Sequence, residues 1–415
     1  MNILHPSSES VKVAIRLRNV PTWKRDRNDN VRPDTSLART TRPPGSLTPL
    51  PDLSNTKNEK KGYYDYSIVC NAGERDAAGV CSSVTISDPN GRKEQKDFSY
   101  DCVFPIDDGQ EAVYNRMVRP MISRCLEGYN GCIFAYGQTA SGKTYTMEGA
   151  KTKDLKDKGV IFRVAEQIVS HFKQHSDVEF SVTGSYLEIY QESLRDLMTD
   201  DDDTELKIRM NPNSVTGKDL YIEGLRERLL VTEADYIRMI NSGTRKRAVA
   251  ETNMNQVSSR SHAVLTLIIK QYEKVSSNSQ QACGGMKRSK IHLIDLAGSE
   301  RANMTGAVGQ RFKEGSAINQ SLTSLGNVIN ALSNNASYVP YRDSKLTYLL
   351  SDSLGGNSLT LVLACVTPIA NAYEETISTL RFAERAKRVK NKARINIDPN
   401  LLRYTLLMQD LENGS

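Results

Sequence analysis

Eight consecutive residues, Gly137–Thr144 (GQTASGKT), have the GxxxxGK[ST] pattern that binds nucleotide phosphates. They directly follow the short apolar stretch Cys132–Tyr136, which is typical of a buried strand. In such a loop the glycines let backbone N–H groups point into a concave anion site at the start of a helix. Lys143 can reach the β- and γ-phosphates, and the Thr144 hydroxyl can bind Mg²⁺. The pattern therefore predicts a site for a nucleoside triphosphate and its metal ion.

A second acidic element is needed to hold the water shell of such a metal, and Asp295 ends the hydrophobic stretch Ile291–Asp295. Alone, an aspartate at the end of a strand is more often a turn residue or a helix cap. Here Ala297–Glu300 (AGSE) follows, and Gly298 at a strand end can bring its N–H group to a γ-phosphate. Asp295 is therefore interpreted as part of the same site.

The segment Ser258–His262 (SSRSH) is a third polar cluster, and alone it is equally well explained as a structural turn. Arg260 in this segment and the later Glu300 carry opposite charges. An ion pair between them would join two loops around one nucleotide. Because an ion pair on the surface contributes little, the hypothesis matters only if both loops meet at the phosphates.

Strand-like and helix-like stretches alternate along the chain, as in an α/β protein. The expected strands are Val11–Leu17, Cys132–Tyr136, Glu179–Tyr190, Ala263–Tyr272, Ile291–Leu296 and Leu359–Val366. The expected helices are Gln110–Leu126, Val160–Gln174, Thr232–Thr244, Ala317–Leu332 and Glu374–Lys390. The stretch 23–61 is polar and has no sustained period, so it is interpreted as an insertion or loop, not a second domain.

The composition, with 38% hydrophobic and 25% charged residues among 415, is close to that of an average soluble globular protein. It excludes disordered, collagen-like and disulfide-scaffold proteins. The net charge of +6 permits an acidic partner without requiring one, and no nucleic-acid partner is expected. The longest apolar run, Leu359–Val366, is far below the roughly 20 residues that span a bilayer, so no membrane insertion is expected. Seven cysteines without a CxxC pair, and no secretory leader, predict a reducing compartment and buried thiols.

Three segments, taken in order, resemble the phosphate loop and the two switches of kinesin motor domains: Gln138–Gly149 (QTASGKTYTMEG), Asn255–His262 (NQVSSRSH) and Asp295–Arg301 (DLAGSER). Four further segments are similar to the same family: Ser185–Leu197, Tyr341–Leu346, Leu354–Asn357 and Thr376–Lys387. The similarity covers about residues 11 to 396 apart from the polar insertion. Three nucleotide motifs in this order, with partner-facing segments between them, are specific for the family.

The resemblance implies a P-loop NTPase fold of three layers, with helices on both sides of a mostly parallel, eight-stranded central sheet. It implies ATP and Mg²⁺ as ligands and microtubules as the partner. The nucleotide-binding residues that it implies are Arg16, Arg18, Gln138, Thr139, Ala140, Ser141, Gly142, Lys143, Thr144 and Tyr145. Tyr145 would stack on the adenine, and the alternative is an ordinary buried aromatic residue.

The resemblance also assigns the chemistry around the γ-phosphate. Thr144 and Ser259 would lie at the metal, and Asp295 would bind it through a water molecule. The residues implied to sense the γ-phosphate and to order the attacking water are Asn255, Ser258, Arg260, Gly298 and Glu300. The Arg260–Glu300 pair would close only around ATP. No side chain is an obvious strong base, which is consistent with phosphoryl transfer by positioning and electrostatics.

Basic side chains are expected to contact tubulin, whose surface is acidic. The residues implied are Arg311, Lys313, Tyr341, Arg342 and Lys345, and the alternative for each charge is an ordinary solvated surface residue. Asn19 replaces the proline of the family's Arg-x-Arg-Pro sequence, and Gln320 replaces a lysine at the start of its main microtubule helix. These departures predict altered nucleotide affinity and weaker microtubule binding.

The resemblance divides the chain into an N-terminal extension (1–10), a motor domain (11–390), a neck linker (391–400) and the start of a neck or tail (401–415). The segment Asn391–Pro399 (NKARINIDP) resembles the neck linker of N-terminal transport kinesins, which implies plus-end-directed stepping through linker docking. A homo- or heterodimer through a coiled coil outside this chain is expected, with a cargo that the sequence does not specify. The expected location is the cytoplasm, on the cytoskeleton, including a spindle or axoneme.

Two other functions are compatible with parts of the sequence. A nucleotide-gated microtubule-binding or depolymerising module is favoured by Asn19 and Gln320 but opposed by the neck linker. A signalling GTPase is compatible with the phosphate loop, but the chain has no Asn-Lys-x-Asp guanine signature.

Overall fold

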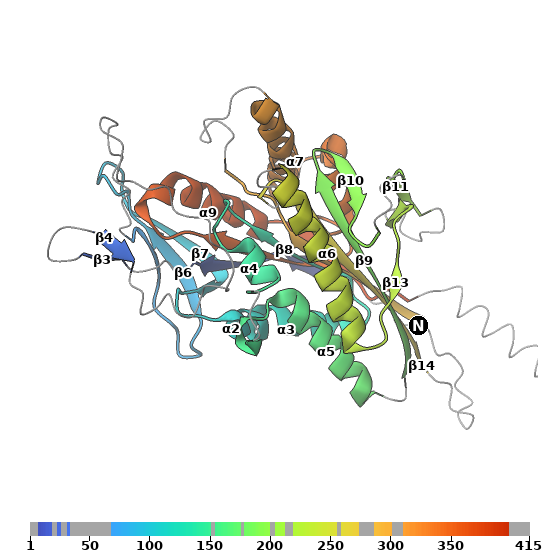
Figure 1. The fold of residues 1–415 in the computed structure, drawn as a ribbon. Helices are drawn as coiled ribbons and strands as arrows, with labels where there is room; N and C mark the ends of the chain where they lie inside the picture. The colour runs from blue at the N-terminus through green and yellow to red at the C-terminus, as the bar shows by residue number, and fades with distance from the viewer. Residues whose placement is uncertain are drawn as a thin grey trace, which may run out of the picture.

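The computed structural model describes residues 7–18, 23–25, 31–33, 68–150, 154–175, 178–199, 204–211, 219–254, 259–273, 286–300 and 310–397. These residues form one large sheet with helices on both faces (Figure 1). Of the polar stretch 23–61, the structure describes the two short paired strands β3 (Trp23–Arg25) and β4 (Val31–Pro33). Within the described residues no helix is both long enough and apolar enough to cross a membrane.

The central sheet has eleven described strands in the order β10-β9-β14-β15-β8-β16-β2-β7-β6-β5, with β13 paired to β9. The strands are β2 (Lys12–Leu17), β5 (Cys70–Ala72), β6 (Cys81–Ile86), β7 (Lys96–Phe104), β8 (Gly131–Tyr136), β9 (Val178–Tyr190), β10 (Ser193–Asp196), β13 (Arg228–Leu229), β14 (His262–Glu273), β15 (Met286–Asp295) and β16 (Leu359–Val366). Pairing is parallel from β15 to β7 and antiparallel outside this centre. The three-layer fold is confirmed, but the sheet is wider than the expected eight strands, and its parallel part is limited to the five central strands.

Short connections explain the antiparallel flanks, because a parallel pair needs a long crossover. Only Gln191 and Glu192 separate β9 from β10, and both have positive φ (48° and 58°), as in a two-residue type I′ hairpin. In contrast, α4 and α5 lie between β8 and β9 in the sequence. Alternating connections of these two kinds produce a mixed sheet.

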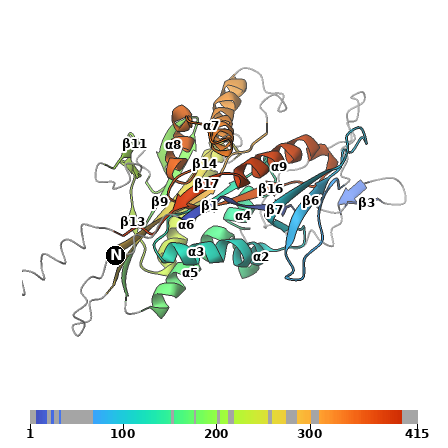
Figure 2. The ribbon, with the colours of Figure 1, turned by 180° about the vertical axis from the view of Figure 1, so that it is seen from behind.

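Helices cover both faces of the sheet (Figures 1 and 2). One face carries α7 (Gln310–Ser333), α8 (Lys345–Leu349) and α9 (Tyr373–Lys387). The other carries α2 (Gln110–Val113), α3 (Arg119–Leu126), α4 (Lys143–Met147), α5 (Val160–Gln174) and α6 (Glu233–Met254). Short helical turns are η1 (Tyr114–Val118), η2 (Leu155–Asp157), η5 (Tyr341–Asp343), η6 (Leu350–Asp352) and η7 (Ala370–Ala372).

The buried strands supply both cores because successive side chains point to opposite faces. In β8, Ile133 belongs to the core under α3 and α5, whereas Phe134 belongs to the core under α7 and α9. In β14, Leu265 and Val264 divide in the same way. Because helices cover both faces of these strands, side chains that point to either face are buried, and such stretches are therefore continuously apolar.

The last expected helix, Glu374–Lys390, ends earlier than predicted, at Lys387. The chain then forms β17 (Lys390–Ala393), which pairs antiparallel with β1 (Ser7–Ser10), so the two ends of the described chain lie side by side (Figure 2). Isolated bridges continue this course, from Ile395 to Tyr129 and from Ile397 to Lys287. Backbone hydrogen bonding, which helical periodicity does not reveal, decides this boundary.

The prediction of buried thiols is confirmed for the six cysteines within the described residues: Cys70, Cys81, Cys102, Cys125, Cys132 and Cys365. Burial raises the pKa of Cys125 and of Cys132 to about 12, so both remain protonated. Cys283 lies outside the described residues.

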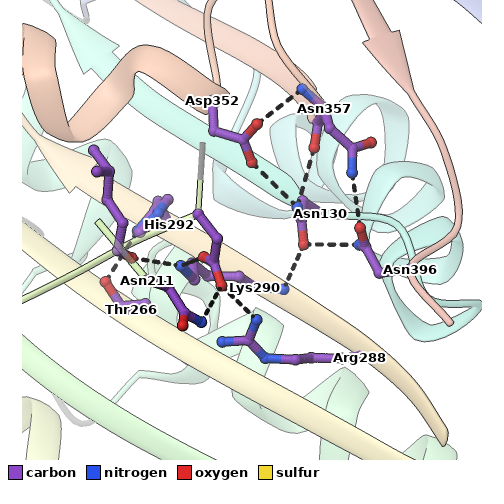
Figure 3. A network of polar contacts seen from close by, with 11 residues as sticks. Asn130, Asn211, Thr266, Arg288, Lys290, His292, Asp352, Asn357 and Asn396 are labelled. Atoms are coloured by element: carbon purple, nitrogen blue, oxygen red, sulfur yellow. Dashed lines mark hydrogen bonds and ion pairs between the residues drawn. The ribbon is translucent and has the colours of Figure 1, made fainter. Parts of the chain in front are cut away.

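Asp219 ties a small hairpin, β11 (Lys207–Met210) and β12 (Leu220–Glu223), to the central sheet. Its carboxylate accepts hydrogen bonds from Lys290 Nζ at 2.5 Å and Arg288 Nη1 at 2.9 Å, both on β15, within the polar network of Figure 3. Burial alone would raise the pKa of Asp219, but the two cations lower it from 3.8 to about 2. The charged carboxylate therefore stabilises the folded protein.

Asp219→Asn is expected to lower the free energy of unfolding by about 2 kcal/mol at neutral pH. Because the folded pKa is depressed, the contribution is complete above about pH 4 and is lost as pH falls toward about 2. Urea unfolding at pH 7 and at pH 3 measures this, with Glu374→Gln as control, since the Lys93–Glu374 pair is exposed. A difference between wild type and Asp219→Asn that does not shrink at pH 3 would contradict the assignment.

Candidate nucleotide site

The predicted phosphate loop connects the end of β8 to the start of α4, at the edge of the sheet where the central parallel strands end. Gly137 has φ 144°, and a Cβ atom there would lie 2.1 Å from the Cys365 carbonyl oxygen of β16. Gly142 also has a positive φ, 101°, directly before the helix. The first glycine is needed for both its conformation and the close approach of β16, so the motif serves the fold as well as the ligand.

Lys143, Thr144 and Asp295 meet at this loop, as predicted. The buried Lys143 Nζ donates hydrogen bonds to the carbonyl oxygens of Gly137 at 2.9 Å and Gln138 at 2.8 Å. Burial lowers the pKa of Lys143. The Thr144 hydroxyl donates to Asp295 Oδ2 at 2.7 Å. The motif lysine, the motif hydroxyl and the strand-end carboxylate therefore form one cluster.

The cluster fits a phosphate and a hydrated metal ion. Two of its buried oxygen atoms, Asp295 Oδ1 and Ser141 Oγ, have no hydrogen-bond partner among the described residues. A buried polar atom without a partner is costly, so such atoms mark places where a ligand or water is expected. A carboxylate and hydroxyl oxygens are the donors that Mg²⁺ prefers.

Arg247 is a charged member of the site that the sequence did not reveal. It lies on α6, is buried, and its Nη1 atom lies 2.7 Å from Asp295 Oδ2 and 4.0 Å from Glu148 Oε1. Its Nη2 atom donates to the Ser261 carbonyl oxygen at 3.1 Å. Burial raises the pKa of Glu148, although Arg247 opposes the shift. Arg247 and Thr144 therefore both donate to the same oxygen of Asp295, and together they hold the carboxylate in place.

The segment after Asp295 folds onto the phosphate loop. Gly298 N donates to the Ser259 carbonyl oxygen at 2.8 Å, and Ser299 N donates to the Gly137 carbonyl oxygen at 3.1 Å. The two expected switch segments and the phosphate loop are therefore joined by backbone hydrogen bonds. A Cβ atom on Gly298 would lie 2.3 Å from Thr139 Oγ1, so only glycine fits without a shift.

Glu300 lies over the phosphate loop. Its carboxylate accepts a hydrogen bond from Thr139 N at 2.7 Å and a second from the Thr139 hydroxyl. The half-buried Arg260 is near the start of the described segment 259–273, and Asn255 and Ser258 lie outside the described residues. The predicted Arg260–Glu300 pair remains a prediction.

Arg16 and Arg18, which the resemblance assigns to the nucleotide, lie beside the loop. Buried Arg16 donates to Gln110 Oε1 at 2.6 Å and to Thr146 Oγ1 at 2.8 Å. Its guanidinium carbon lies 5.1 Å from the ring centroid of Tyr145, and Arg18 donates to the Ala140 carbonyl oxygen. Tyr145 is 40% exposed, so it is not an ordinary core residue, and its stacking on adenine remains a prediction. Asn19 lies outside the described residues.

The residues expected to contact tubulin lie near α7 and α8. Arg342 is exposed, whereas the backbone N–H of half-buried Lys345 donates to Glu192 Oε2 at 2.6 Å. Tyr341 is also half-buried, and its hydroxyl donates to the Leu354 carbonyl oxygen at 2.5 Å. Tyr341 can therefore hold η5 against the segment that contains Leu354. Arg311 and Lys313 belong to α7 by their backbone, and their side chains lie outside the described residues.

Comparison with known proteins gives a consistent result. A family model for the kinesin motor domain matches residues 55–389. The human chromosome-associated kinesin KIF4B is 45% identical over 323 residues, which cover 76% of this chain and 25% of the relative. Kinesin-related protein 3 of Dictyostelium discoideum is 42% identical over 351 residues, which cover 84% of this chain and 28% of the relative. The chain spans about a quarter of the length of these curated relatives.

Two solved structures are similar over nearly the whole chain. A fast kinesin is 34% identical, with a TM-score of 0.74 over 94% of each chain. A KIF14 dimer in complex with a microtubule, with AMP-PNP, is 33% identical. Its TM-score is also 0.74, over 96% of this chain and 100% of that chain.

Proposed function

The chain belongs to the kinesin motor-domain family, and from this premise we propose that it hydrolyses ATP and moves toward the plus ends of microtubules. One observation carries the proposal: the phosphate loop, Ser259 and Asp295 with its following turn meet around one cluster of buried oxygen atoms. Three segments far apart in the sequence form this cluster, as a nucleotide switch requires.

In this proposal Thr144 and Ser259 hold Mg²⁺, and Asp295 binds it through a water molecule. When bound there, the ion would supply positive charge for the transferred phosphoryl group. Lys143 exchanges the carbonyl oxygens of Gly137 and Gln138 for phosphate oxygens when ATP is bound. The attacking water is ordered by a separate set of groups: Asn255, Ser258, Arg260, Gly298 and Glu300. Positioning by these groups replaces a strong general base.

The C-terminal segment supports a neck-linker role. Asn396 is bound on several sides: its Nδ2 atom donates to Asn130 Oδ1 at 3.1 Å, and its Oδ1 atom accepts from Asn357 Nδ2 at 2.7 Å (Figure 3). Its carbonyl oxygen accepts from Arg288 N at 3.0 Å. These bonds hold the segment along the core, as a docked neck linker requires. In the proposed mechanism, opening of the switches would weaken them.

We further propose that α7 and the η5–α8 surface face tubulin, with Arg311, Lys313, Tyr341, Arg342 and Lys345 contributing. Gln320 is exposed on α7, where the family has a lysine. This exposed amide favours the second candidate, a nucleotide-gated microtubule-binding or depolymerising protein with little motility. The described linker contacts favour the motor.

Gliding of polarity-marked microtubules over surface-bound protein distinguishes the two candidates. We expect ATP-dependent gliding with minus ends leading, together with stimulation of ATP hydrolysis by microtubules. Shortening of filaments without gliding would favour the second candidate. The absence of stimulation in a folded, ATP-binding sample would refute both, and competition between ATP and GTP for binding tests the GTPase alternative.

We propose dimerisation through a coiled coil outside this chain and a microtubule-associated location. The similarity to proteins named chromosome-associated kinesins favours the spindle over the axoneme. Cargo recognition is expected in the remaining three quarters of a protein of that type.

A further inference from the structure

His262 joins the segment after Asp295 to α7. Its imidazole is buried, with 2% of the residue exposed. Ala297 N donates a hydrogen bond to His262 Nδ1 at 3.1 Å. The other ring nitrogen, Nε2, lies 2.7 Å from the hydroxyl oxygen of Ser321 on α7. One side chain therefore contacts the nucleotide loops and the helix that the proposed function places on tubulin.

The hydrogen-bond partners decide the tautomer. A backbone N–H group can only donate, so Nδ1 must be unprotonated and Nε2 carries the proton. Nε2 then donates to Ser321 Oγ. Burial lowers the pKa of His262 to about 3, so the ring stays neutral and can keep one acceptor and one donor. The donor and the acceptor of each of the two hydrogen bonds are therefore fixed.

The neighbours of His262 are coupled to the nucleotide cluster. Ala297 stands between Asp295, which binds the Thr144 hydroxyl, and Gly298, which binds the Ser259 carbonyl oxygen. On the other side, Leu322 follows Ser321 and is buried in the core beneath α7. A shift of the Ala297 N–H group must therefore break one of the two hydrogen bonds of His262 or move Ser321.

We propose that His262 is a positioning residue that couples the segment 295–300 to α7, so that nucleotide state changes the placement of the tubulin-facing helix. The role of α7 in this inference rests on the proposed function. The ordinary alternative is a buried histidine that contributes only to stability. That alternative predicts no special connection between the two elements.

Two variants break the link at α7. His262→Asn keeps an acceptor near the position of Nδ1 and removes the Nε2 donor, and Ser321→Ala removes the partner. We expect each to raise the microtubule concentration for half-maximal ATPase stimulation about tenfold, with unstimulated turnover changed less than about twofold. The double variant should need no more microtubules for half-maximal stimulation than either single variant, because each substitution removes the same His262–Ser321 hydrogen bond.

His292→Asn is the matched control. His292 is also buried, on β15, and its Nδ1 atom lies 2.9 Å from Thr266 Oγ1 of the neighbouring strand, so this hydrogen bond stays within the sheet and does not involve α7. It should cost comparable stability but leave microtubule stimulation unchanged. Equal effects of His262→Asn and His292→Asn on stimulation, or additive effects in the double variant, would overturn the coupling.

Hydrogen exchange without microtubules separates this inference from the proposed function. A non-hydrolysable ATP analogue should change amide protection both in 295–300 and in 320–333 of the wild type, but only in 295–300 of His262→Asn. Joint changes that survive in His262→Asn refute the coupling even if the motor is active. Joint changes that are lost in this variant support it even if microtubules fail to stimulate the ATPase.

Discussion

Lys143→Ala is expected to reduce ATP turnover about 10³-fold, both with and without microtubules. The ammonium group is buried at the base of the loop and donates to two carbonyl oxygens that flank the phosphate position. An alanine leaves these oxygens without donors and leaves developing phosphate charge without a cation. Burial disfavours the charged form of Lys143. The free-energy cost of burying this charge must be offset by hydrogen-bond acceptors or by phosphate oxygens.

Steady-state hydrolysis and equilibrium binding of a fluorescent ATP analogue measure the effect of Lys143→Ala. The control is Lys173→Ala, which removes an exposed lysine near the end of α5, on the face of the sheet opposite α7. That control should retain normal turnover. Retention of more than about a tenth of wild-type turnover in folded Lys143→Ala would show that the loop does not bind the transferred phosphate.

Glu300→Ala is expected to bind ATP with an affinity close to that of the wild type but to hydrolyse it at least about 10²-fold more slowly. The carboxylate accepts its hydrogen bonds from Thr139, whereas Lys143 and Thr144 bond to other groups, so the proposed phosphate and metal contacts of these two residues should remain. In the proposed mechanism, closure of the switches would require Glu300 to leave Thr139 and to pair with Arg260. Without the carboxylate, the proposed water-ordering arrangement would not form.

Glu300→Gln separates the two contacts of this residue. The amide retains an oxygen acceptor for Thr139 N–H but has no charge for Arg260. Single-turnover hydrolysis should be slow in both Glu300→Ala and Glu300→Gln, whereas ATP binding should be nearly normal in both. Wild-type hydrolysis in Glu300→Gln would mean that the Thr139 contact, and not an ion pair with Arg260, is the important one.

Local patterns predicted much of the framework. The bounds of Val160–Gln174 and Leu359–Val366 agree with α5 and β16, because amphipathic period and continuous apolar sequence are local properties. The number and direction of the flanking strands were not predictable in this way. Pairing of β9 with β14 or of β1 with β17 joins residues far apart in the sequence, and the partner is chosen by the assembled sheet.

The nucleotide cluster was predictable because a phosphate loop combines its glycines, lysine and hydroxyl within eight residues. Arg247 was not, since it is the last of three consecutive basic residues, and the expected helix ended before them at Thr244. In the longer α6, Arg245 is exposed and Arg247 is buried. Only the phase of the completed helix, and the carboxylate that it meets, distinguishes the two.

The position of β2 has a practical consequence for defining the boundaries of a fragment to express. The family match begins at residue 55, yet β2 lies between β16 and β7 and pairs in parallel with both. A fragment trimmed to the matched region would lack a strand from the middle of the sheet and expose two apolar edges that normally never meet water. Such edges recruit other chains, so the trimmed protein would aggregate instead of behaving as a smaller motor. For this chain, the region matched by the family model is shorter than the unit of folding.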